Sequence, residues 1–203
     1  MTDLKWIHHL DRGTASDLTL LLLHGTGGNE AQLLPLGRQV APGATLLGVR
    51  GRSLEEGFPR YFRRFSAIEY DQAQIRSEAA ALAQFVREAA QAYDLNPARI
   101  VALGYSNGAN MALATLALHP QTFLGAALLR PVMPLEEPPQ TDLGRVSALV
   151  LHGAHDPYAA HASGVVPYLK GQGAAVQSRL LNAGHELGGE DLHLTAEWLA
   201  GLS

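Results

Sequence analysis

The residue of this 203-residue chain best suited to chemistry is Ser106, in the stretch Gly-Tyr-Ser-Asn-Gly from Gly104 to Gly108. The stretch fits G-x-S-x-G, in which a serine stands on a sharp turn between a strand and a helix. An apolar segment precedes it and Ala-rich sequence follows it. Glycines on either side leave room for a turn whose strained backbone exposes the hydroxyl. The pattern predicts a nucleophilic serine; the alternative is an ordinary turn with a capping serine.

A serine hydroxyl becomes a good nucleophile when a base takes its proton and a carboxylate orients that base. On an alternating strand–helix scaffold the chain order is Ser, then Asp or Glu, then His, each after a strand. His185, between a strand-like run and a final helical pattern, is the histidine in the expected place. The other histidines precede the serine, belong to predicted helices or flank the predicted acid: His8, His9, His24, His119, His152, His155, His161 and His193.

Asp156 is the predicted acid because it follows a strand-like run and a glycine turn and stands just before a proline. This order places its carboxylate beside the serine, although an aspartate that caps a loop is the alternative. Glu186 adjoins the base and is poorly placed to orient the same imidazole. The acids of the preceding Pro-rich loop are also less well placed: Glu136, Glu137 and Asp142.

Ester chemistry also needs two backbone N–H groups aimed at the oxyanion that forms on the attacked carbonyl. Asn107 is expected to supply one, because it begins a helix, where free amides favour an anion. The glycine-rich loop HGTGG, residues 24–28, is expected to supply the other from Thr26 or Gly27. The same loop is unlike a nucleotide cradle, since it is not G-x-G-x-x-G and no Gly-Lys-Ser/Thr follows it.

Apolar runs of strand length alternate with helical patterns along nearly the whole chain. Runs bounded by Gly, Pro and His are typical of strands covered on both faces. The predicted strands are 18–23, 44–49, 99–103, 124–129, 148–151 and 176–181, and the predicted helices are 30–40, 71–93, 107–118, 161–172 and 190–199. This alternation predicts one α/β domain over residues 1–203, a doubly wound, mostly parallel sheet flanked by helices without a large cap domain. Segments 50–65 and 130–142 are expected to be loops that border the site.

Composition excludes several classes of function. A net charge of −4 gives no general attraction to nucleic acid or anionic membranes. With no cysteine, the chain has no disulfide, thiolate nucleophile or cysteine zinc site. The histidines of HGAHD lack a hydrolytic zinc spacing, so we expect no metal. Apolar runs such as residues 20–23 are too short to cross a bilayer, and no signal segment is evident, so we expect a cytoplasmic protein without stable membrane insertion.

Five stretches in this order, LLLHGTGGNE, VRGR, GYSNGAN, LHGAHDP and NAGHEL, make the chain resemble the phospholipase/carboxylesterase family of the α/β-hydrolase superfamily. Acyl-protein thioesterases of that family typically carry Gln where this chain has Asn107, and Leu-Gly-Asp where it has residues 26–28. The resemblance is therefore greater to the bacterial carboxylesterase branch. It implies a Ser106, Asp156 and His185 triad, with an oxyanion hole from the Thr26 and Asn107 amides.

Five of the fifteen basic residues lie between positions 50 and 64. We expect at least one of these arginines to bind an anionic group of the substrate, with solvated loop charges as the alternative. Aromatic residues of the same segment either wall the pocket or anchor the loop. The candidate substrate-binding residues are Arg50, Phe62, Arg63 and Arg64.

These observations predict a serine carboxylesterase that hydrolyses small to medium esters through an acyl-enzyme, with no cofactor. A thioesterase or another acyl hydrolase with the same triad is one alternative. A non-catalytic protein that binds a small molecule on a hydrolase fold is another. The expected partner is the ester substrate alone, and a homodimer is left open.

Overall fold

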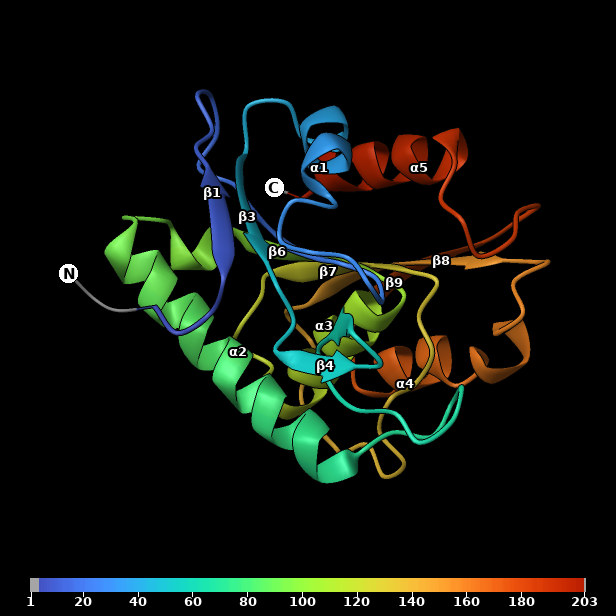
Figure 1. The fold of residues 1–203 in the computed structure, drawn as a ribbon. Helices are drawn as coiled ribbons and strands as arrows, with labels where there is room; N and C mark the ends of the chain where they lie inside the picture. The colour runs from blue at the N-terminus through green and yellow to red at the C-terminus, as the bar shows by residue number, and fades with distance from the viewer. Residues whose placement is uncertain (1–3, 203) are drawn as a thin grey trace.

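The computed structural model describes residues 4–202 as a central sheet with helices on both faces (Figure 1). The sheet has seven strands in the order β1-β3-β2-β6-β7-β8-β9. They are β1 (His8–Asp11), β2 (Thr19–Leu23), β3 (Thr45–Val49), β6 (Ile100–Tyr105), β7 (Gly125–Leu129), β8 (Ser147–Gly153) and β9 (Ala175–Leu181). All neighbouring strands are parallel except β1 and β3. The predicted doubly wound, mostly parallel α/β sheet is confirmed.

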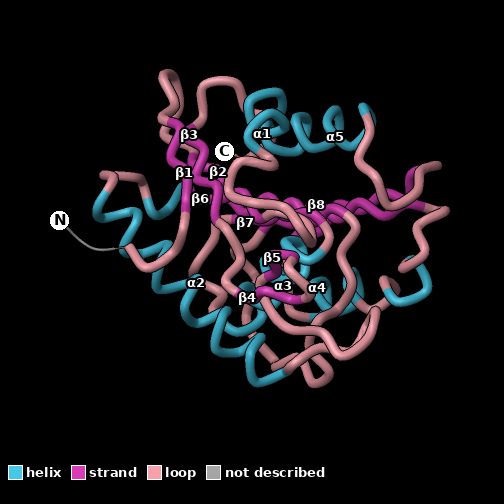
Figure 2. The backbone as a smooth tube through the Cα atoms, in the orientation of Figure 1, coloured by secondary structure: helices cyan, strands magenta, loops and turns pink. Residues whose placement is uncertain are grey.

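Helices cover the two faces of this sheet and bury its apolar strands (Figures 1 and 2). One face carries α2 (Gln72–Ala92), α3 (Asn107–Leu118) and α4 (Val165–Gly171). The other carries α1 (Leu34–Val40) and α5 (Gly189–Ala200), whose Trp198 and Leu199 belong to a second core cluster. Every residue of β2, β3 and β7 is buried, which explains why these strands read as unbroken apolar runs.

Three short features differ from the sequence-based prediction. The segment 50–65 is not wholly irregular, because it contains a hairpin of β4 (Ser53–Glu55) and β5 (Phe58–Arg60). Strand β1 was not predicted; it pairs antiparallel with β3 at one edge. At the other edge, β9 is largely exposed, with Leu180 at 70% exposure, so the prediction that it is covered on both faces is wrong.

Two predicted helices are also shorter than expected. Helix α1 begins at Leu34, where Pro35 occupies the first turn, and turns precede it over residues 30–33. Before α4, a short 3₁₀ helix over Ala159–His161 takes the place of the expected α-helical start. The Pro-rich segment 130–142 contains no helix or strand, as predicted. No helix within residues 4–202 is both long and apolar enough to span a membrane.

Candidate active site

Ser106 occupies the sharp turn between β6 and α3. Its backbone has φ 53° and ψ −114°, a region that residues with a side chain rarely adopt. The turn is secured on both sides, because the Ser106 N–H donates to the Leu129 carbonyl at 2.8 Å and its carbonyl accepts from the Asn110 N–H at 3.0 Å. The hydroxyl therefore projects from a rigid point at the carboxyl edge of the sheet.

Glycines 104 and 108 allow this turn because backbone atoms surround both positions. A Cβ atom at Gly104 would lie 2.6 Å from the backbone of α3, and one at Gly108 would lie 2.0 Å from the Leu23 carbonyl oxygen. No side chain fits at such distances. The predicted reason for the glycines, close contact between the turn and its neighbouring strand and helix, agrees with this packing.

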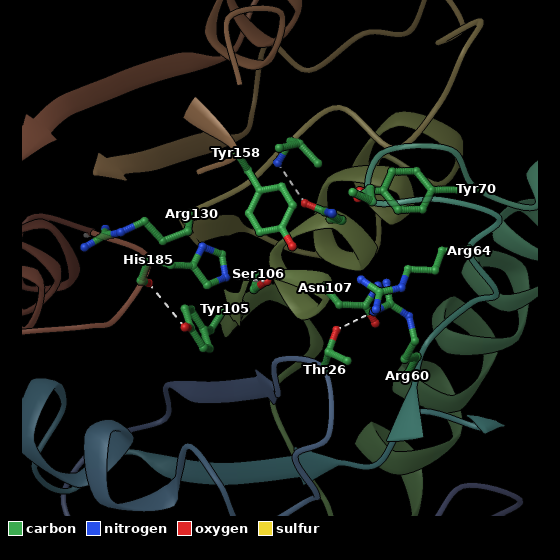
Figure 3. A pocket seen from close by; sticks show the side chains of 13 residues that line it. Thr26, Arg60, Arg64, Tyr70, Tyr105, Ser106, Asn107, Arg130, Tyr158 and His185 are labelled. Carbon is green, nitrogen blue, oxygen red and sulfur yellow. Dashed lines mark hydrogen bonds between the residues drawn. The ribbon is translucent and has the colours of Figure 1, made fainter. Parts of the chain in front are cut away.

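The predicted base and acid lie on loops that follow β9 and β8. Figure 3 shows the base, His185, next to Ser106. The Ser106 Oγ lies 2.9 Å from His185 Nε2, and His185 Nδ1 lies 2.8 Å from Asp156 Oδ2. With a proton on Nδ1, the imidazole donates to Asp156 and accepts from the serine hydroxyl. The Asp156 side chain is only 5% exposed, and its other oxygen accepts from the Tyr158 N–H at 2.8 Å. This geometry suits proton transfer from Ser106 to His185.

A buried ion pair holds the loop that carries His185. Arg130 and Asp191 side chains are 0% and 1% exposed, and Nη1 and Nη2 of Arg130 donate to the two Asp191 oxygens at 2.7 and 3.0 Å. The same guanidinium donates to the carbonyls on either side of the histidine, Gly184 at 2.9 Å and Glu186 at 3.1 Å. Arg130 thus links β7, α5 and the histidine loop. The sequence analysis missed both charged residues.

The two predicted oxyanion amides also lie at this edge of the sheet. Thr26 and Asn107 line the same cleft as Ser106 and His185. Asn107 is the first residue of α3, so its N–H has no acceptor within the helix. Neither this N–H nor that of Thr26 donates to another residue within 4–202. Both amides are available to an anion.

Buried His24 fixes the shape of the loop that carries Thr26. Its Nδ1 donates to the Gly25 carbonyl at 2.6 Å, and its Nε2 accepts from the Gly51 N–H at 2.9 Å. Since Nε2 must remain free to accept, this arrangement requires a neutral ring. Burial lowers the pKa of His24 below 6.5 and so favours the neutral form. His24, which was excluded as the base because it precedes the serine, therefore has a structural role in the site.

Two asparagines on the first turn of α3 attach the loops that border the cleft. Asn107 Oδ1 accepts from the Tyr61 N–H at 2.8 Å, and Asn110 Oδ1 accepts from the Val132 N–H at 2.8 Å. The two side chains are three positions apart and so lie on one face of the helix. The stretch Ser-Asn-Gly-Ala-Asn therefore holds both walls of the cleft in addition to carrying the serine.

The cleft has a volume of about 290 Å³, and side chains from both bordering loops line it (Figure 3). Of the predicted substrate-binding residues, Arg64 lines it. Arg50 instead pairs with Glu30, Arg63 approaches Glu55, and Phe62 is fully buried in the core; none of these three lines the cleft. Cleft residues that were not among the predicted site residues include Arg60, Tyr70, Tyr105, Arg130 and Tyr158.

The arrangement of the potential metal ligands shows whether a metal ion could bind. Among residues 4–202, no three His, Asp or Glu side chains are arranged to hold one. Of the histidines in HGAHD, His155 bonds to Asn182 at 2.8 Å, and burial lowers the pKa of His152.

A mostly parallel sheet flanked by helices, with a serine turn, an imidazole and a carboxylate at its carboxyl edge, is typical of the α/β-hydrolase class of fold. Solved carboxylesterases from Bacillus cereus and Mesorhizobium loti superpose on this chain with a TM-score of 0.95 each. They are 35% and 40% identical to it; the match covers 99% of this chain in both cases and 96% and 97% of theirs. MhqD, a predicted hydrolase of Bacillus subtilis (strain 168), is 38% identical over 94% of this chain and 96% of its own.

The sequence model of the phospholipase/carboxylesterase family matches residues 55–202. The chain belongs to this family, as the resemblance implied.

Removing the carboxylate of the buried Arg130–Asp191 pair should lower the free energy of unfolding. Asp191→Asn leaves the Arg130 cation buried without a counter-charge, so we expect a loss of about 3–5 kcal/mol in the free energy of unfolding. Asp17→Asn is the matched control, because Asp17 is 60% exposed and pairs with Arg99 at 3.3 Å; it should cost less than about 1 kcal/mol. Guanidinium titrations compare the variants, and similar costs would contradict the proposed importance of the buried pair.

One buried and two partly buried histidines should make the free energy of unfolding depend on pH. Burial lowers the pKa values of His24, His119 and His152 below 6.5, so these rings stay neutral in the folded chain at pH values where the unfolded chain takes up protons. The unfolded state then binds more protons, and the free energy of unfolding should fall as the pH drops below 6.5. Denaturant midpoints at pH 7.5 and 5.5 measure this, and His119→Gln should reduce the difference. Equal stability at both values would refute it.

Proposed function

We propose that this chain is a serine carboxylesterase that hydrolyses small to medium carboxylic esters through an acyl-enzyme. The observation that carries the proposal is the continuous hydrogen-bonded line from Ser106 through His185 to Asp156, at 2.9 and 2.8 Å. Membership of the phospholipase/carboxylesterase family supports the same reaction. We also propose that residues 1–203 act as one domain.

In the first half of the reaction, His185 Nε2 takes the Ser106 proton as Oγ attacks the ester carbonyl. Asp156 keeps the imidazole in the required tautomer and stabilises the cation that forms. The carbonyl oxygen becomes an oxyanion, which the Thr26 and Asn107 N–H groups bind. When the tetrahedral intermediate collapses, the bond to the alcohol breaks, and His185 returns the proton to the leaving alkoxide. The acyl group is then bonded to Ser106.

In the second half, a water molecule takes the place of the alcohol. His185 removes a proton from this water, whose oxygen attacks the acyl carbon. The same two amides bind the second oxyanion, and Ser106 leaves with the proton from His185. The carboxylic acid is released and the side chains return to their starting protonation states. A rigid Ser106 turn and a fixed histidine loop suit this cycle, since both steps use the same geometry.

Replacement of the nucleophile tests the proposal. Ser106→Ala should lower kcat/KM for p-nitrophenyl butyrate by at least about a thousandfold, because the triad acts as a unit. Ser77→Ala is the matched control; Ser77 is exposed on α2, and its loss should leave turnover unchanged. Circular dichroism verifies folding. Undiminished turnover in Ser106→Ala would end the proposal, and a strong preference for the matched butyryl thioester would make the protein a thioesterase.

A further inference from the structure

Arg60, at the end of β5, is a buried cation that has no carboxylate partner among residues 4–202. It is 4% exposed, and its Nη1 donates to Thr26 Oγ1 at 2.6 Å while its Nε donates to the Phe62 carbonyl at 3.3 Å. Its Nη2 donates to no residue within 4–202. Charged side chains are rarely buried unless they are paired. The guanidinium therefore retains donors for a partner that residues 4–202 do not supply.

Arg64 adds a second cation at the same place. Arg60 and Arg64 both line the cleft that holds Ser106 and the hollow next to it. Burial lowers the pKa of Arg60, and the charge of Arg64 lowers it further. Two like charges at one wall of a cleft repel each other unless an anion lies between them. This pairing favours an anionic ligand.

Two carboxylates, Glu55 and Glu56, line the hollow next to the cleft. Glu55 accepts from Ser53 Oγ at 2.9 Å and lies 3.9 Å from Arg63. No carboxylate among residues 4–202 lies within ion-pair distance of Arg60 or Arg64. In contrast, the other buried arginine, Arg130, binds both oxygens of Asp191. Of the two buried arginines that line the cleft, Arg130 therefore has a carboxylate partner, and Arg60 has none among residues 4–202.

The position of the arginines indicates which part of an ester they would meet. In Figure 3, His185 lies on one side of Ser106, and Arg60 and Arg64 lie on the other, next to Thr26 and Asn107. The leaving alcohol must lie near His185, which protonates it. The acyl chain then extends toward the arginines.

We propose that Arg60 and Arg64 bind a carboxylate on the acyl part of the substrate, so that half-esters of short dicarboxylic acids are preferred. The inference rests on the proposed esterase function. Guanidinium groups bind carboxylates through paired, charge-assisted hydrogen bonds. The cleft volume of about 290 Å³ suits an acyl group of a few carbons.

The test compares monomethyl glutarate with methyl valerate, which has the same number of acyl carbons but no charge. Wild type should have the higher kcat/KM for the half-ester. Arg64→Gln should lower the ratio of the two kcat/KM values by about tenfold or more, because a charge-assisted contact is lost. Arg60→Gln should act in the same direction, and Arg60→Lys should restore part of the ratio. Arg179→Gln, an equal loss of charge on exposed β9, should leave both values unchanged.

Calorimetric titration with glutarate gives a readout that does not need turnover. Glutarate should bind wild type and bind more weakly to Arg64→Gln. Equal losses on both esters, or no glutarate binding at millimolar concentration, would overturn the inference. If both esters are hydrolysed with equal kcat/KM values, the esterase proposal stands and the proposed carboxylate site is rejected. If neither is hydrolysed but glutarate binding depends on Arg64, the esterase proposal falls instead.

Discussion

Backbone atoms of α3 pack directly against the end of β2, and the rest of the site depends on this contact. It exists because position 108 is glycine: a Cβ there would lie 2.0 Å from the Leu23 carbonyl oxygen. Close packing forces the chain through the strained turn at Ser106, with φ 53°. The same turn presents the first N–H of α3 to the cleft and aims Asn107 and Asn110 at the bordering loops. One steric constraint thus sets the positions of Ser106, of the Asn107 N–H and of both walls of the cleft.

Two buried arginines, Arg130 and Arg60, lie at the carboxyl edge of the sheet and differ in their partners. Arg130 has its counter-charge, Asp191, and uses its remaining donors to hold the carbonyls on either side of His185. Its charge is neutralised within the protein, so its effect on the reaction is the position of the base. Arg60 is equally buried, but within the described residues it bonds only to neutral oxygens, and its remaining donors face the cleft. Because of this difference in pairing, Arg130 is suited to positioning His185 and Arg60 is suited to binding substrate.

The sequence was most informative where the chemistry limits both residue type and chain order. Ser106, Asp156 and His185 each follow a predicted strand, and parallel strands bring their carboxyl ends to one edge, so their meeting could be predicted. The Arg130–Asp191 pair could not, because its members are 61 positions apart and neither lies in a motif. Strand β1 and the β4–β5 hairpin are too short to give a periodic signal. The fold of segment 50–65, which includes that hairpin, determines which of its arginines line the cleft. The residue types alone do not predict which ones these are.

In the proposed reaction Ser106 is the nucleophile, and the surrounding residues activate it. Labelling with a fluorophosphonate, followed by peptide mass spectrometry, tests this most directly, since the probe reacts with a serine whose proton a base can remove. If Ser106 is the activated nucleophile, the folded protein should carry one phosphonate per chain, on the peptide that contains Ser106, and the denatured protein should not be labelled. A label on another serine, or equal labelling of folded and denatured protein, would contradict it.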